Sequence, residues 1–302
     1  MRSWLVIPAM AVVTAGAAIG VGFARGAVSP VDVIGCAGVG AALSAAIRAL
    51  AGDSPASLAG AVLAPLLVIS TLFDPALAAH AAWRAWLAIG ALGWTIVELA
   101  RPTTSPLVAL LPACVAAVCD PSLVPLVPIA SARVVTAPWR RPPWALAIPI
   151  AGTLVLLLGI LACTAGGGAL AALGDRWCGA PAASRAPLSL AMLAADRLGP
   201  MVAVAALGGL AVVARPRHAE IAVLACVAGA VLVSFRTGAI GPAVVALAAV
   251  SVALAIGRFA AMIRLPAGQA VVAATAGALL VLPPAWAAVE HGHRVSIGRA
   301  SR

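Results

Sequence analysis

The chain has 302 residues, of which 64% are hydrophobic and only 9% are charged. Soluble globular domains contain about 25% charged and about 45–50% apolar residues, so this composition excludes an ordinary soluble fold. The formal net charge of +10 comes from arginines scattered singly through short polar segments, a pattern typical of membrane-protein loops rather than of a nucleic-acid-binding surface. We therefore expect an integral membrane protein whose partners are membrane lipids, with no nucleic-acid partner.

Apolar runs follow one another along almost the whole chain. A membrane-spanning helix takes about 20 residues and a short connection about 4–8, so the length accommodates roughly eleven spans and no soluble domain. The predicted spans are 4–24, 32–50, 56–73, 77–100, 106–119, 122–137, 144–169, 187–214, 219–235, 239–257 and 266–288. They lack the alternation of barrel strands. The sequence thus predicts an all-α, polytopic transmembrane helix bundle of about 9–11 spans over residues 1–289, followed by a short polar tail at 290–302.

Three of the apolar runs have unusual lengths or breaks. The first, Trp4 to Ala24, exceeds the roughly 7–15 residues of a signal-peptide apolar region, which favours an uncleaved first helix. Segment 106–119 is short for a crossing, and segment 122–137 contains Pro125, Pro128 and Arg133. The pair is interpreted either as two spans or as one re-entrant hairpin.

The arginine distribution predicts the orientation of the chain. The side that holds the N-terminus carries ten arginines, and the opposite internal loops carry Arg25, Arg176, Arg185 and Arg236. Loops rich in Arg stay in the cytoplasm, so the N-terminus is predicted to be cytoplasmic and the protein to be a multi-pass protein of the cell inner membrane. Three tail arginines would then lie outside, which leaves the side of the C-terminus open.

Repeated Ser-Pro and Asp-Pro steps predict where helices begin. They occur at Ser29-Pro30, Ser54-Pro55, Asp74-Pro75, Ser105-Pro106 and Asp120-Pro121. A side-chain oxygen at the N-cap followed by proline at the first helical position is the usual start of a helix.

Ionisable residues in apolar segments are candidate functional groups, because they are costly at membrane depth. His80 and Arg84 are four residues apart near the start of one segment, with Asp74 at the preceding turn and Trp83 and Trp86 beside them. One interpretation is an interfacial first turn with an aromatic belt; the other is an outward-facing anion or headgroup site.

Asp196 and Arg197 interrupt another long apolar segment. On the predicted topology they lie at the outer face, where they could pair with Arg84 and Asp74 and clamp two segments together. Asp32, just after the first outer loop, also falls on this side. Candidate binding residues are therefore Asp32, Asp74, His80, Arg84, Asp196 and Arg197.

Other signals are weaker. No spacing suits a metal site, and no nucleotide or catalytic fingerprint is present, so we expect neither a metal nor another cofactor. Cys119 and Cys178, both predicted at outer segment ends, could form a disulfide. Glu98 and Arg101 are expected to form a surface ion pair, and the Gly16-x-x-x-Gly20 stripe is expected to make close helix contacts.

Three functions are compatible with this pattern. The first is a transporter or flippase-like protein for a small solute or a lipid, with broken helices around its site. The second is a non-catalytic scaffold subunit. The third is an outer-face transferase acting on a lipid-linked substrate, with Asp32 as the first candidate base and Arg84 or Arg197 on phosphate.

Overall fold

The computed structural model describes residues 5–24, 28–52, 55–72, 82–100, 106–136 and 241–263, with shorter stretches within 223–229 and 265–280. Every regular element in these ranges is helical, which confirms the predicted all-α class for this part of the chain. The principal helices are α1 (Val6–Ala24), α2 (Pro30–Ala51), α3 (Pro55–Leu72), α4 (Ala82–Ala100), α5 (Pro106–Cys119), the 3-10 helix η2 (Pro121–Leu123), α6 (Leu126–Thr136) and α12 (Pro242–Ala261).

Prolines start these helices where the sequence predicts. Helices α2, α3, α5 and η2 begin at Pro30, Pro55, Pro106 and Pro121. Ser29 is the N-cap of α2, and its Oγ accepts a hydrogen bond from the backbone N–H of Asp32 at 3.4 Å. Proline fits the first turn because its missing N–H would have no intrahelical partner there. The step at Asp74 lies outside the described residues.

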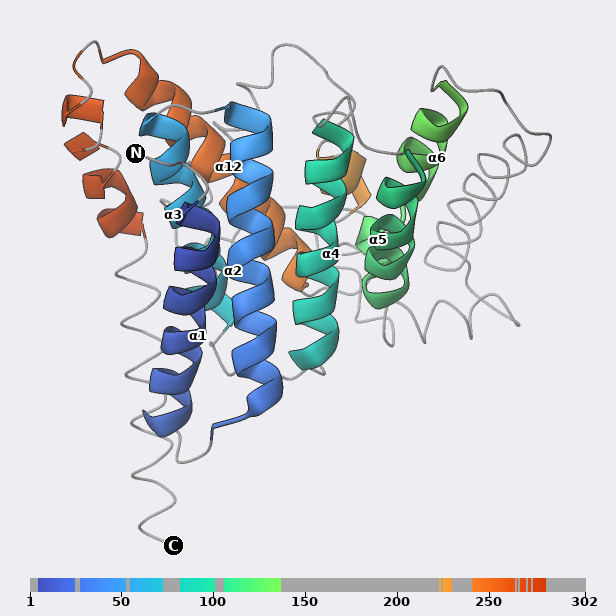
Figure 1. Cartoon of the computed structure of the whole chain (residues 1–302), viewed down its shortest axis with the longest axis horizontal. Coiled ribbons are helices and arrows are strands. Elements are labelled where there is room, and N and C mark those ends of the chain that lie inside the picture. The colour runs from blue at the N-terminus through green and yellow to red at the C-terminus, as the bar shows by residue number, and fades with distance from the viewer. Residues whose placement is uncertain are drawn as a thin grey trace, which may run out of the picture.

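Helix α2 lies at the centre of the first four helices, between α1 and α4 (Figure 1). Helix α1 runs antiparallel to it: the Thr14 Oγ1 is 2.8 Å from the Cys36 carbonyl oxygen, while Gly40 faces Met10. Helix α4 runs parallel to α2. Trp86 contacts Asp32 near the start of both helices, and Gly93 faces Ala42 near the middle of both. Large buried side chains such as Leu43 and Ile89 fill the core.

Small residues let α2 and α4 approach closely. A Cβ added at Gly93 of α4 would lie 2.9 Å from the carbonyl carbon and oxygen of Ala42 in α2. Such backbone-to-backbone contact is typical of helices packed in lipid. The expectation for Gly16 and Gly20 is wrong within the described residues, because a Cβ at either position would meet nothing within 4 Å. In so apolar a helix, spacing alone does not reveal which face packs.

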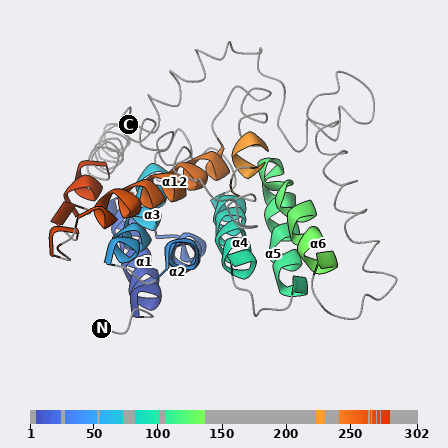
Figure 2. The ribbon, with the colours of Figure 1, turned by 90° about the horizontal axis from the view of Figure 1, so that it is seen from above.

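Helices α3 and α12 cover one face of this layer. Figure 1 shows α12 passing obliquely behind α2, and Figure 2 shows it along one side of the layer, next to α3. The Ser44 hydroxyl of α2 donates a hydrogen bond to the Ala61 carbonyl of α3 at 2.6 Å. A Cβ at Gly60 would come within 3.0 Å of the Ala253 carbonyl oxygen in α12. Among the described residues, the opposite face of α2 and α4 is therefore the one left uncovered.

Helices α5 and α6 fold back on each other as a short hairpin beside α4 (Figure 1). At 1.5 Å per residue their 14 and 11 residues measure about 21 Å and about 17 Å, less than the roughly 30 Å of a bilayer's hydrocarbon core. At the turn, Oδ1 of Asp120 accepts hydrogen bonds from the backbone N–H of Ser122 at 3.0 Å and from its hydroxyl at 2.6 Å. Because residues on both sides of this pair lie outside the described ranges, two spans and one re-entrant hairpin both stay predictions.

Two helical stretches among the described residues are long and apolar enough to cross a membrane, judged by length and composition alone. They are Val6–Phe23 and Pro30–Ala51. A buried helix of a soluble protein or a signal sequence would meet the same criterion. The structure therefore supports membrane association in this coarse form, and the count of 9–11 spans stays a prediction.

Candidate functional site

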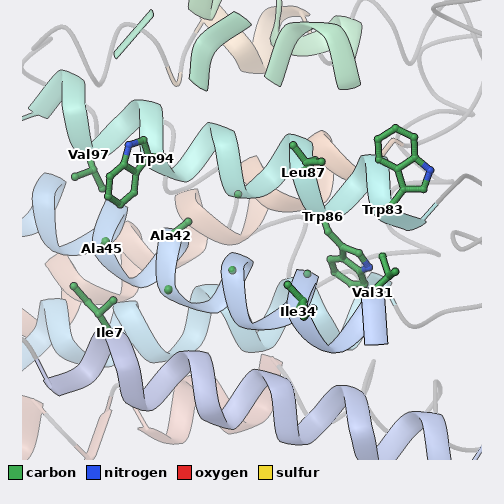
Figure 3. Close-up of a pocket in the computed structure, with 14 residues that line it drawn as sticks. Ile7, Val31, Ile34, Ala42, Ala45, Trp83, Trp86, Leu87, Trp94 and Val97 are labelled. Atoms are coloured by element: carbon green, nitrogen blue, oxygen red, sulfur yellow. The ribbon is translucent and has the colours of Figure 1, made fainter. Parts of the chain in front are cut away.

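An apolar groove runs between α2 and α4 on the face that α12 leaves open. It encloses about 740 Å³, within the roughly 300–1,000 Å³ typical of ligand pockets. Its walls are almost wholly apolar (Figure 3). Helix α2 contributes a stripe from Val31 to Ala45, helix α4 contributes a stripe from Trp83 to Val97, and Ile7 of α1 lies at one side.

Helical periodicity creates the two walls. On α4, five of the six lining residues recur every three or four positions: Trp83, Leu87, Gly90, Trp94 and Val97. Such spacing places them in one row along the helix. The sixth, Trp86, lies beside this row. Because each row covers 14 residue steps and a helix rises 1.5 Å per residue, the groove is about 21 Å long. Trp83, Leu87 and Trp94 are half exposed and form the rim.

Two glycines keep the groove open. A Cβ at Gly38 on α2 or at Gly90 on α4 would meet nothing within 4 Å, and both residues line the groove. They differ from Gly93, which faces the backbone of α2 directly. Larger side chains at Gly38 or Gly90 would therefore project into the groove without pushing the helices apart.

A hydrogen bond fixes the groove at its Val31–Trp83 end. The indole Nε1–H of Trp86 donates to Oδ1 of Asp32 at 2.9 Å. The Trp86 ring lies on Gly35, where an added Cβ would be 2.5 Å from the ring's Cγ and Cδ1 atoms. Trp86 is only 6% exposed. Asp32 thus positions the indole that lines this end, and it lies in the first turn of α2, where a negative charge is favourable.

Arg84 lies near the same end, but its side chain is not one of those that line the groove. Its guanidinium carbon is 5.3 Å from the centroid of the Trp83 ring, a cation–π distance. Arg84 is exposed, and it is close enough to Cys119 at the end of α5 to interact with it electrostatically. Two of the six predicted site residues, Asp32 and Arg84, are therefore at one end of the bundle, and neither contacts the other within the ranges described above.

The other four predicted site residues, Asp74, His80, Asp196 and Arg197, lie outside the described residues. The proposed clamp between their segments therefore stays a prediction. The structure instead adds Trp86, Trp94, Gly38 and Gly90, which the sequence analysis did not assign to a site. For the three residues on α4, the row of aromatic and small residues along that helix was the signal that could have revealed them.

A second, smaller groove lies on the other side of the α4 rim. It encloses about 570 Å³ between α4 and α5, with Leu111 and Val115 on the α5 side. Gly90 and Trp94 line both grooves. Trp94 therefore lies between two apolar grooves on adjacent faces of α4.

Two charged residues that sequence analysis left out of the site are buried near the other end of α2 and α4. Arg48 is 8% exposed and Glu98 is 4% exposed, and both make polar interactions. The predicted surface position of the Glu98–Arg101 pair is wrong for Glu98, because its side chain is buried; the pairing itself stays a prediction. Arg101, its expected partner, lies outside the described residues. A buried charge is unfavourable unless it has polar partners, so we interpret both residues as structural.

The described part of the chain contains neither a disulfide nor a cluster of metal-ligand side chains. Cys36, Cys114, Cys119 and Cys226 are free thiols, and Cys178 lies outside the described residues. No group of three or more His, Cys, Asp or Glu side chains is arranged to hold a metal ion within those same residues.

No protein-family model, curated protein or solved structure matches the chain.

Proposed function

We propose that the protein is a multi-pass integral membrane protein of the inner membrane, with its N-terminus in the cytoplasm. The support is the exposure of apolar side chains on uncharged helix surfaces. In α1, Val12 is 72% exposed and Phe23 is 74% exposed; in α5, Leu111 is 72% exposed. Contiguous apolar surface of this kind is unfavourable in water and favourable against lipid tails.

The first helix belongs to this bundle. Thr14 is fully buried between α1 and α2, and Ala18 is part of the main core. A cleaved signal sequence would leave the Cys36 carbonyl, Gly40 and their neighbours without this partner. Exposed apolar side chains also continue beyond α1, onto α2, α4 and α5, so the membrane-facing surface does not depend on the first helix alone.

Within the membrane, we propose a transporter or flippase-like role for a lipid rather than for a small polar solute. The groove carries this proposal: it opens sideways between two helices and is lined by apolar groups along its length. A polar solute would lose its hydration there without gaining hydrogen bonds, whereas a lipid tail would lose nothing. The described residues give no support to the transferase alternative, because the Asp32 carboxylate is engaged by Trp86 and does not line the groove.

Reconstitution tests this role. The full chain is incorporated into liposomes that carry a trace of phospholipid with a fluorescent headgroup, and dithionite is added to bleach the outer leaflet. We expect the protein to increase the bleached fraction, and Gly90→Leu to reduce this effect by filling the groove. Gly20→Leu is the matched control, because it adds the same side chain at an open, lipid-facing position of α1. Bleaching equal to that of protein-free vesicles would reject the role and favour the scaffold alternative.

A further inference from the structure

The groove has chemically different ends. One end is lined by the Trp83 and Trp86 rings. Just outside the lining, the Asp32 carboxylate accepts the Trp86 N–H, and the Arg84 guanidinium stacks on Trp83. At the far end, around Ala45 and Val97, the lining is aliphatic. An amphiphile fits such a groove in one direction only, with its polar head beside the aromatic end.

We propose that the groove binds one acyl chain of a membrane phospholipid, with the lipid phosphate beside Arg84. This inference rests on the proposed function and specifies its substrate class. On the predicted topology the aromatic end faces the outer leaflet, where Trp rings prefer the headgroup level. The length of about 21 Å, at 1.5 Å per residue, reaches beyond the middle of a hydrocarbon core of about 30 Å. That depth suits an extended acyl chain entering from the outer leaflet.

The guanidinium of Arg84 is the group at this end that would bind phosphate. Asp32 already accepts the Trp86 N–H, whereas the guanidinium of Arg84 is exposed and has no carboxylate partner within the described ranges. Arginine presents several N–H donors that match phosphate oxygens, and stacking on Trp83 restricts its motion before the lipid arrives.

The headgroup must supply most of the selectivity. A lipid tail is already in an apolar solvent when it leaves the bulk membrane, so the groove offers it packing but little hydrophobic gain. The apolar lining therefore admits many acyl chains, and the contact between Arg84 and phosphate distinguishes phospholipids from neutral lipids.

Quenching of tryptophan fluorescence tests this inference on the full chain in detergent micelles. The probes are a phosphatidylglycerol with brominated acyl chains, a diacylglycerol with the same chains, and glycerol phosphate without chains. Brominated chains in the groove quench Trp94 and Trp83, which line it. We expect the brominated phospholipid to bind about tenfold more tightly than the diacylglycerol, the ratio that one charge-assisted contact of about 1.4 kcal/mol supplies. Glycerol phosphate alone should not change the fluorescence.

Three variants separate the parts of the inference. Arg84→Gln should remove the preference for phosphatidylglycerol and leave diacylglycerol binding unchanged. Gly90→Leu should abolish saturable quenching by both lipids, while Gly20→Leu should bind as the unaltered chain does. Circular dichroism verifies that each variant is folded.

Distinct outcomes overturn the two proposals. Equal affinity of the unaltered chain for both lipids, or an unchanged preference in Arg84→Gln, rejects the phosphate contact even if lipids still cross the bilayer. Binding of glycerol phosphate as tight as that of the phospholipid rejects the acyl-chain site in favour of a free-phosphate site. Expected binding without any lipid movement in liposomes rejects the flippase-like role and leaves the phospholipid site intact.

Discussion

Replacing Gly93 by alanine tests the parallel packing of α2 and α4, which builds both the core and the groove. The new Cβ would lie 2.9 Å from the Ala42 carbonyl carbon and oxygen and 3.0 Å from the Ala42 Cβ. Carbon atoms pack at about 3.5–4.0 Å, so the helices must separate by roughly 0.5–1 Å. A gap of about that size forfeits a quarter to a half of each contact energy across the interface.

The expected loss is about 1–3 kcal/mol, the usual cost of overpacking a well-packed core. Gly90→Ala is the matched control, because Gly90 lies one turn earlier on the same helix and an added Cβ there meets nothing within 4 Å. Both changes gain the same helix propensity, of roughly 0.8–1 kcal/mol, which cancels in the comparison. The difference between the two variants therefore isolates the steric contact.

The free energy of unfolding is measured by titrating the purified chain with SDS in mixed micelles and following tryptophan fluorescence and helix content. We expect Gly93→Ala to unfold at a lower SDS fraction than Gly90→Ala. A difference in unfolding free energy of less than about 0.5 kcal/mol between the two variants would not distinguish them. In that case α2 and α4 do not meet at Ala42, and the groove described above does not exist.

Three further experiments probe the site and the topology. In a double-mutant cycle, Asp32→Ala and Trp86→Phe should show a coupling of about 1.5–3 kcal/mol in SDS unfolding, because their hydrogen bond has a charged acceptor and each change removes it. Additive effects would contradict this hydrogen bond. Ser44→Ala should cost only about 0.6 kcal/mol by the same assay, the average for interhelical hydrogen bonds in membranes, and a loss above about 2 kcal/mol would contradict lipid as the surrounding solvent. Val28→Cys should react with a membrane-impermeant maleimide in intact cells more than the unaltered chain does, whereas Ala51→Cys should require permeabilisation; the reverse pattern would invert the orientation.

The buried charges show what a local pattern cannot predict. Glu98 lies at the end of an apolar segment, where a short-range comparison with Arg101 suggests a surface pair. Its burial is a property of how α4 packs in the bundle, which the spacing to Arg101 does not contain. The same holds for Asp32 and Trp86, which are 54 positions apart. A hydrogen bond between residues so far apart cannot be predicted from the periodicity of either helix.

The sequence by itself determined the all-α class and the starts of four helices, among them Pro30 and Pro106. Both depend on groups only a few residues apart: a backbone satisfied within its own segment, and caps that act within one turn. Tertiary structure decided that Gly93 rather than Gly16 makes the close contact, and that the Trp83–Val97 row borders a groove. When nearly every face of a helix is apolar, periodicity does not distinguish a face that packs on protein from one that meets lipid, because both environments are equally apolar.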